Sequence, residues 1–123
     1  MRRQDVGRLG EDLAVLHLQQ AGLTIQQRNW RCRYGEIDII CTQGATVVFT
    51  EVRTLRTRHR GRPEASIAVS KRRKLVRASQ LWLQQHGGSD RPIRFDVVAI
   101  ELKGPTPIVR HTQGAFDAAG DVL

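Results

Sequence analysis

Two neighbouring runs of β-branched and apolar residues contain charged side chains in their interiors. The first run contains Glu36 and Asp38, and the second, residues 47–53, contains Glu51 and Arg53. Alternate residues of a strand point to the same face, so each charged pair shares a face of its strand. A charge inside a buried strand is costly unless it is paired or binds a ligand. The spacing therefore indicates a salt-bridge cluster or a metal site.

The segment between the two runs contains Gly44, which is typical of a tight turn, so we expect the runs to pair as an antiparallel hairpin. A hairpin centred on this turn sets Asp38 opposite Glu51, and Glu36 opposite Arg53. Directly opposed side chains in such a pair have Cβ atoms roughly 4.5–5.5 Å apart, where like charges repel each other. A divalent cation held by both carboxylates removes that repulsion.

Two carboxylates that hold Mg²⁺ or Mn²⁺ beside a cation are suited to phosphodiester hydrolysis. The metal activates water and polarises a phosphoryl oxygen, while the cation stabilises charge that develops in the transition state. A structural interpretation stays open, in which Glu36 and Arg53 form an ion pair and Asp38 is solvated at a sheet edge.

The chain has a formal net charge of +8 and a pI near 11.0, and its basic residues are concentrated in one segment. Between residues 54 and 77 a single acidic residue, Glu64, accompanies the basic residues Arg56, Arg58, Arg60, Arg62, Lys71, Arg72, Arg73, Lys74 and Arg77. Such density predicts a nucleic-acid partner contacted mainly through its phosphates, since aromatic residues are few. An RNA partner is compatible with the charge, although the sequence contains no recognisable RNA-binding motif. A membrane surface is disfavoured because no apolar anchoring face accompanies the charge.

The length of 123 residues predicts one domain, over residues 1–118, followed by a frayed tail of residues 119–123. No apolar run approaches the roughly 18 residues that cross a membrane, and no secretory signal is expected at the N-terminus. Cys32 and Cys41 show no metal-binding or redox spacing, and we interpret them as reduced thiols of a cytoplasmic protein, with a disulfide as the alternative.

The run after Gly44 is apolar on both faces, which predicts a central strand with helices on both sides of a mixed sheet. Asp96 lies inside a later strand and is expected to pair with Arg94 rather than to bind metal. Residues 54–69 are expected to form a basic loop. The expected elements are helices over residues 7–21 and 71–86, strands over residues 23–31, 35–40, 47–53, 93–100 and 108–110, and a weakly specified tail from residue 113.

The first helix contains two glycines, Gly7 and Gly10, directly before Glu11. Glycine inside a helix costs up to about 1 kcal/mol relative to alanine, so the pair indicates a close approach of another element or of a phosphate. Alternatively, the helix begins near Gly10 and Glu11 is an acid of its first turn.

Six motifs in this order resemble the bacterial YraN-type family. They are residues 7–11 (GRLGE), 29–31 (NWR), 35–38 (GEID), 48–53 (VFTEVR), 94–98 (RFDVV) and 114–116 (GAF). The resemblance implies an α/β, restriction-endonuclease-like fold of three layers, in which a central mixed sheet with an antiparallel hairpin core is flanked by helices. Similar folds occur in archaeal Holliday-junction resolvases of the PD-(D/E)XK nuclease superfamily.

The same resemblance implies that Glu11, Asp38 and Glu51 bind the metal, and it places Arg53 where the superfamily motif has lysine. Arginine stays protonated, so Arg53 is expected to stabilise charge at the scissile phosphate and not to act as a general base.

The expected function is therefore a Mg²⁺- or Mn²⁺-dependent endonuclease that acts on structured or branched DNA. The alternative is a non-catalytic nucleic-acid-binding protein that retains the nuclease fold. Related resolvases work as twofold dimers, so a homodimer is a further open expectation.

Overall fold

The computed structural model describes residues 2–56, 67–88 and 90–123, in which five strands form a single open sheet. The strands lie in sequence order from β1 to β5, and all neighbours are antiparallel except β3 and β4, which are parallel. The elements are α1 (Arg3–Gln20), β1 (Thr24–Cys32), β2 (Gly35–Gln43), β3 (Thr46–Leu55), α2 (Val69–Gln85), β4 (Ile93–Glu101) and β5 (Ile108–Phe116).

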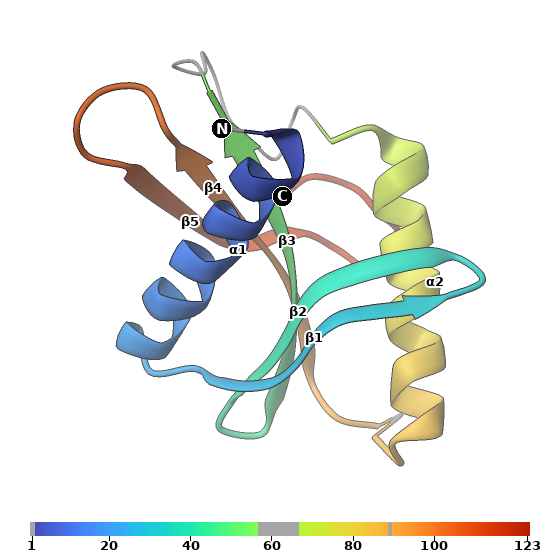
Figure 1. The fold of residues 1–123 in the computed structure, drawn as a ribbon. Coiled ribbons are helices and arrows are strands. Elements are labelled where there is room, and N and C mark those ends of the chain that lie inside the picture. Colours follow the sequence, from blue (N-terminus) through green and yellow to red (C-terminus); the bar gives the residue numbers. More distant parts are fainter. Residues whose placement is uncertain (1, 57–66, 89) are drawn as a thin grey trace.

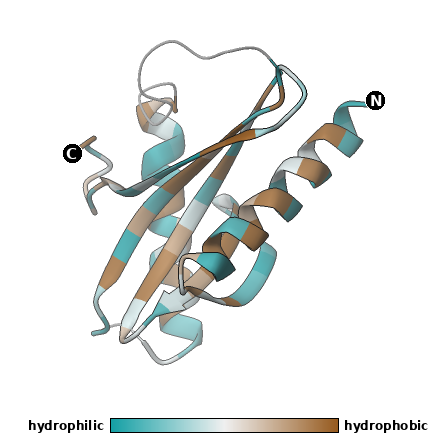
Figure 2. Cartoon of the chain, turned by 90° about the vertical axis from the view of Figure 1, so that its left-hand side faces the viewer, coloured by the Kyte–Doolittle hydropathy of each residue, from teal (hydrophilic) through white to brown (hydrophobic). Residues whose placement is uncertain are grey.

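The two helices cover opposite faces of the sheet, which gives three layers with β3 at the centre (Figure 1). Hydrophobic residues recur along α1 and along the strands beside it (Figure 2). The apolar core is divided into two clusters, one on each face. The α2 side includes Ile37, Phe49, Trp82 and Phe95, and the α1 side includes Leu18, Ile39, Val48 and Val98. The expected three-layer, restriction-endonuclease-like architecture is confirmed.

The register predicted for the central hairpin is confirmed. The pairs of β2 and β3 run from Gln43 with Thr46 to Ile39 with Thr50, as a turn at Gly44 requires. Gly44 has φ of 59°, a conformation that glycine adopts without strain.

The expected opposition of Glu36 and Arg53 is wrong. At its N-terminal end β2 pairs with β1, and Glu36 there lies opposite Arg31. This end of the β1–β2 hairpin extends toward α2 (Figure 1), where Tyr34 packs against the core cluster on that side. The hairpin therefore separates Glu36 from β3, and Arg53 lies opposite Ala99 of β4 instead.

Helix α1 begins at Arg3, earlier than expected, so the alternative of a start near Gly10 is wrong. A Cβ atom on Gly10 would lie 1.9 Å from Oγ1 of Thr54, whereas one on Gly7 would meet nothing within 4 Å. Gly10 therefore permits α1 to contact β3 directly. This contact fixes the position of the next residue, Glu11, over the sheet.

The last strand is longer than the expected strand over residues 108–110. β5 continues through Gly114, whose φ of 60° accompanies an irregularity in the β4–β5 register, and it ends at Phe116. Phe116 then forms a bridge with Val122, and the backbone N–H of Leu123 donates to the carbonyl of Ala115 over 3.1 Å. Backbone hydrogen bonds therefore join residues 119–123, the segment expected to fray, to the end of the sheet.

Both cysteines are free thiols, as expected. Burial raises the pKa of Cys41 to about 11, which keeps this thiol protonated and unreactive near neutral pH. Among the described helices, neither has the length and apolar character that crossing a membrane requires.

Candidate metal centre

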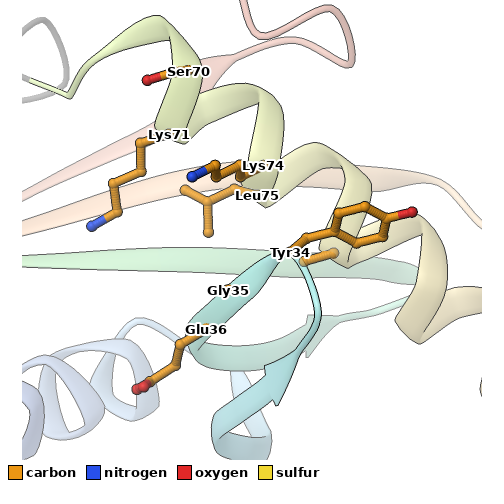
Figure 3. A pocket seen from close by; sticks show the side chains of 8 residues that line it. Tyr34, Gly35, Glu36, Ser70, Lys71, Lys74 and Leu75 are labelled. Carbon is orange, nitrogen blue, oxygen red and sulfur yellow. The ribbon is translucent and has the colours of Figure 1, made fainter.

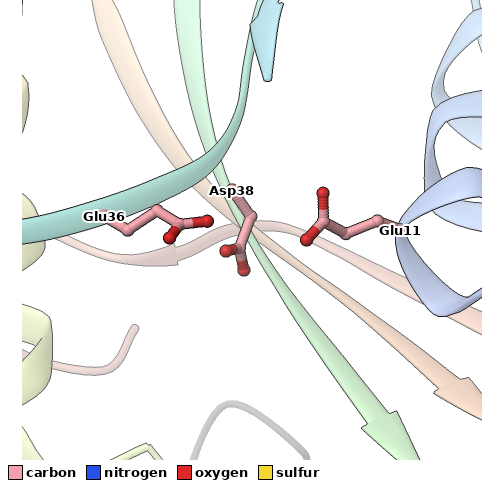
Figure 4. A group of neighbouring side chains, drawn as sticks. All are labelled: Glu11, Glu36 and Asp38. Carbon is pink, nitrogen blue, oxygen red and sulfur yellow. The ribbon is translucent and has the colours of Figure 1, made fainter. Parts of the chain in front are cut away.

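Three carboxylates from α1 and β2 point toward one another (Figure 4). Glu11 extends from α1, and Glu36 and Asp38 extend from one face of β2, so that one oxygen of each lies within 4.8 Å of the other two. We call these three residues the carboxylate cluster. The sequence and the family resemblance assigned Asp38, Glu51 and Glu11 to the metal site, whereas Glu36 was expected opposite Arg53, with an ion pair between them as the structural alternative. Strand periodicity was the available signal for Glu36, because this residue and Asp38 are two positions apart.

Asp38 interacts electrostatically with three charged side chains, those of Glu11, Glu51 and Lys71. Its Oδ2 accepts the backbone N–H of Val52 over 2.8 Å, which ties β2 to β3 where the regular pairing ends. The pKa of Asp38 is raised to about 8, first by burial and then by the negative charges of Glu51 and Glu11, against the opposing effects of the Val52 N–H and Lys71. A cation bound here would relieve this unfavourable charge.

Glu51 is close enough to raise the pKa of Asp38, but it is not part of the carboxylate cluster. Its side chain is only 4% exposed, and Nζ of Lys71 on α2 lies 2.6 Å from its Oε1. The structure thus brings together the two carboxylates that the sequence set opposite each other, but Glu51 already has a positively charged partner. A residue predicted to contact nucleic acid, Lys71, provides that charge.

Asn29 is the contributor to this centre that sequence reasoning missed. Its Nδ2 donates to both carboxylate oxygens of Glu11, over 2.9 and 3.0 Å, and to Oε1 of Glu36 over 2.7 Å. The residue has φ of 53°, the left-handed region that Asn tolerates better than most residues. An asparagine interrupting a strand pattern was the signal that would have indicated this role.

Two arginines of β1 form ion pairs with carboxylates of the cluster. Arg28 on β1 donates to Asp12 over 2.8 Å and lies 3.6 Å from Glu11, and Arg31 donates to Glu36 over 3.0 Å. Arg53 lies on β3 beyond Glu51, and its Nε is buried. These contacts hold the outer carboxylates in fixed orientations before any ligand arrives.

The basic residues of α2 do not form a single surface. Lys71 and Lys74 line a cavity of about 320 Å³ that adjoins Glu36 (Figure 3). Arg73 and Arg77 instead line a hollow on another flank of α2, beside residue 118. Only the two lysines among these four residues lie next to the carboxylate cluster.

Arg72 has a structural role. Its guanidinium donates to the carbonyl of Gly120 over 2.6 Å and also to the carbonyl of Ile67. These bonds fasten the C-terminal segment to the beginning of α2. Arg56 is exposed at the end of β3, and the predicted contacts Arg58, Arg60 and Arg62 lie outside the described residues.

Asp96 pairs with Arg94, as the sequence predicted. The carboxylate is fully buried and accepts from Nε and Nη2 of Arg94 over 2.8 and 3.0 Å, and from the backbone N–H of Gly114 over 3.1 Å. Nε2 of His111 lies 2.8 Å from it, and Nδ1 of His111 lies 3.2 Å from Nε2 of His17. Burial alone would raise the pKa of Asp96, but hydrogen bonds from His111, Arg94 and Gly114 lower it.

The carboxylate cluster suits a small divalent cation. Mg²⁺ prefers oxygen ligands and is usually bound by one or two carboxylates together with water and phosphate oxygens. Three carboxylates, each offering one oxygen, can share such an ion and leave coordination positions open for water and substrate. Burial and then the neighbouring carboxylates raise the pKa of Asp38, and a bound cation would favour the ionised form against both effects.

Sequence comparisons place the chain among related bacterial proteins. A model of the uncharacterised protein family UPF0102 matches residues 10–100. A UPF0102 protein of Stutzerimonas stutzeri is 44% identical over 116 residues, which are 94% of this chain and 97% of the relative. One of Anaeromyxobacter dehalogenans is 42% identical over 118 residues, covering 96% and 88% of the two chains, and one of Desulfitobacterium hafniense is 48% identical over 102 residues, covering 82% and 84%.

These matches extend over most of both partners in each comparison, and the range matched by the family model includes the residues of the carboxylate cluster. The family is in the restriction-endonuclease-like superfamily, which agrees with the three-layer fold. The chain therefore belongs to the uncharacterised protein family UPF0102, the YraN-type family.

Proposed function

We propose that this protein is a cytoplasmic, Mg²⁺- or Mn²⁺-dependent endonuclease that hydrolyses phosphodiester bonds in structured or branched DNA. The observation that carries the proposal is the convergence of Glu11, Glu36 and Asp38 beside a cavity lined by two lysines. Carboxylates for a metal next to cations for a polyanion are the combination that phosphodiester hydrolysis requires.

Each residue of the centre has a distinct task in this proposal. The carboxylate cluster holds the ion, which when bound would activate a water molecule and polarise a phosphoryl oxygen. Asn29 orients Glu11 and Glu36 through its three hydrogen bonds. Second-sphere partners of this kind fix ligand geometry in metal sites.

Lys71 and Arg53 are the candidate cations for the substrate. The side chain of Lys71 is 48% exposed and contacts Glu51. Lys71 also lines the cavity beside Glu36, so it could reach a phosphate bound next to the carboxylate cluster. Lysine can also release a proton, which arginine cannot. Arg53 contributes positive charge from β3. Direct metal binding by Glu51 would require Lys71 to move away from it.

A cleavage assay on a panel of substrates tests the proposal. Labelled linear duplex, single-stranded, flapped and four-way-junction DNA are incubated with Mg²⁺, Mn²⁺ or EDTA, and an RNA duplex is included for comparison. The variants are Asp38→Ala and, as a matched control, Asp90→Ala, which alters an exposed aspartate outside the carboxylate cluster. Metal-dependent cleavage that Asp38→Ala abolishes and Asp90→Ala retains is the expected result.

The alternative is a nucleic-acid-binding protein without turnover. It is favoured by Arg53 at the position of the superfamily lysine and by the ion pair that already neutralises Glu51. Its signature in the same assay is DNA binding in EDTA without cleavage under any condition, unchanged in Asp38→Ala. That result would overturn the endonuclease proposal.

A further inference from the structure

The cavity between β2 and α2 adjoins the carboxylate cluster but is chemically different from it. Its volume is about 320 Å³, and its lining includes Tyr34, Glu36, Lys71, Lys74, Leu75 and Ala78. Glu36 belongs both to this lining and to the carboxylate cluster, so the two sites are continuous. Figure 3 shows the two lysines extending from α2 on one side and Glu36 from β2 on the other.

The lining combines an apolar floor, an aromatic ring and positive charge. Leu75 and Ala78 are buried, with 6% and 1% of their surfaces exposed. The Tyr34 ring is held by Arg33, whose Nη2 donates to the phenolic oxygen over 3.0 Å and whose guanidinium carbon lies 4.9 Å from the ring centre. Tyr34 also packs against the core cluster on the α2 side, so the part of its ring that lines the cavity is an aromatic surface that a planar group can contact.

The distribution of lysine adds to this pattern. The chain contains three lysines, Lys71, Lys74 and Lys103, among its 20 basic residues, and the first two both line this cavity. Lys71 and Lys74 lie three residues apart on α2 and both line the cavity, so their positive charge favours an anionic group such as phosphate over a neutral ligand. The occupant indicated by the lining is therefore a planar, apolar-faced group attached to phosphate.

We propose that the cavity between β2 and α2 binds one unpaired nucleotide next to the phosphodiester bond that the carboxylate cluster addresses, so that the substrate is DNA with unpaired nucleotides at the cleavage point. The adjacency to a reacting bond rests on the proposed endonuclease function, whereas the nucleotide site itself does not. A cavity of about 320 Å³ lies at the lower end of the ~300–1,000 Å³ usual for small-ligand sites, which suits one nucleotide.

A base inside a duplex has both faces stacked and its pairing edge occupied, so it cannot enter such a cavity without leaving the helix. Enzymes that act on paired bases must spend unstacking energy to extrude them, and this cost disappears when the nucleotide is already unpaired. Flaps, gaps and single-stranded ends are therefore preferred over a fully paired junction.

Binding measurements in EDTA test the nucleotide site independently of any cleavage. Fluorescence anisotropy compares a blunt labelled duplex, the same duplex with one unpaired adenine at either end of one strand, and the same overhanging duplexes with an abasic sugar-phosphate in place of adenine. Stacking of one base on an aromatic side chain gives about tenfold tighter binding. We expect that gain for at least one adenine overhang, and we expect its loss with the abasic overhang, which retains the phosphate.

Two variants locate the effect. Tyr34→Leu keeps an apolar side chain against the core and should remove the preference for the adenine overhang over the abasic one. Lys74→Gln should weaken binding of every duplex, whereas Lys103→Gln, which removes an exposed lysine from the β4–β5 connection, should not. A circular-dichroism melt of each variant confirms that it is folded.

The outcomes separate this inference from the proposed function. Equal binding of the blunt, adenine and abasic duplexes, or a preference that persists in Tyr34→Leu, would overturn the nucleotide site even if the protein cleaves DNA in Mg²⁺. A Tyr34-dependent preference for the unpaired base without cleavage would support the nucleotide site and overturn the endonuclease proposal.

Discussion

The side-chain amide of Asn29 donates to Oε1 of Glu36 over 2.7 Å from a backbone with φ of 53°. The same amide nitrogen bonds Glu11, so one strained residue connects carboxylates from α1 and β2. Strain of this kind persists where the surrounding structure fixes it, and it is common at functional sites. The geometry of the carboxylate cluster therefore depends on a residue that would not itself touch the metal.

Replacing Asn29 separates its backbone role from its side-chain role. Asn29→Gly retains the left-handed conformation and should change the free energy of unfolding by less than about 1 kcal/mol. Asn29→Ala should lower it by about 1–2 kcal/mol because alanine is strained there. Both variants should weaken Mn²⁺ binding about 10–100-fold, as losses of second-sphere partners do. Urea unfolding and isothermal titration with Mn²⁺ measure the two effects, and unchanged Mn²⁺ affinity in Asn29→Gly would contradict them.

Because the pKa of Asp38 is raised, we expect ionisation of this side chain to lower the stability of the metal-free protein as pH rises. With a pKa of about 8 in the folded state and an ordinary value of 3.8, protonated Asp38 favours folding below about pH 4, and this contribution is lost as pH rises through 8. Asp38→Asn, which cannot ionise, should therefore be more stable than wild type near pH 8, by at least about 1 kcal/mol. Near pH 4 the two proteins should differ little.

Thermal melts across this pH range, in EDTA and in excess Mn²⁺, measure the difference. Mn²⁺ should raise the melting temperature of wild type and not that of Asp38→Asn, since a ligand stabilises only the form that binds it. Asp90→Asn is the control without a pH-dependent gain. A lower stability of Asp38→Asn near pH 8 would show that Asp38 is ionised and favourably paired without metal.

The ion pair of Lys71 and Glu51 predicts an asymmetric mutational response. Glu51 is 4% exposed, so Lys71→Gln leaves a buried carboxylate without its cation, whereas Lys71→Arg keeps a positive charge. Removing one partner of a fully buried pair costs about 3–5 kcal/mol, and the half-exposed lysine reduces this to about 1–2 kcal/mol. Lys71→Arg should cost less.

A double-mutant cycle with Glu51→Gln checks this interaction by urea unfolding. The cost of Lys71→Gln should largely disappear in the Glu51→Gln background, because no buried charge is then left unpaired. Lys103→Gln is the matched control and should be neutral. Strictly additive effects would show that the contact between Nζ of Lys71 and Glu51 does not contribute to stability.

The two glycines of α1 should respond in opposite directions to alanine. Gly7→Ala meets no atom within 4 Å and should stabilise the helix by about 0.5–1 kcal/mol. Gly10→Ala would place a Cβ 1.9 Å from Thr54 and should destabilise the protein by about 1–3 kcal/mol. It should also weaken Mn²⁺ binding, since α1 must move with Glu11. Equal stabilities of the two variants would refute the contact between α1 and β3.

The parts of the fold that follow from local pattern could be predicted from the sequence. Alternation of apolar residues and one turn glycine determine the β2–β3 register, and helical spacing determines the faces of α1 and α2. The position of Glu36 could not be predicted, because it depends on where β2 leaves β3 to follow β1 toward α2. That change results from packing of Tyr34 against a helix distant in the sequence.

The same distinction applies to the carboxylate cluster and to the chain end. Glu11 and Asp38 could be assigned to one site. The contribution of Asn29 could not, because it requires a left-handed backbone conformation that the strand-like sequence around it does not indicate. Arg72 donates to the carbonyl of Gly120 in the C-terminal segment, although its neighbours in sequence indicate a nucleic-acid surface. A run of basic residues does not distinguish a phosphate contact from a structural hydrogen bond.

The contact of Gly10 with Thr54 also has a consequence for ion selectivity. Because the Thr54 side chain of β3 already packs against the backbone of Gly10, α1 cannot move closer to β3, and the bonds of Asn29 restrain Glu11 and Glu36. A rigid set of oxygen ligands discriminates between cations by their radius. Mg²⁺ takes such ligands at about 2.0–2.1 Å, whereas Ca²⁺ takes more of them at about 2.3–2.6 Å. We therefore expect Ca²⁺ to bind this centre more weakly than Mg²⁺ or Mn²⁺.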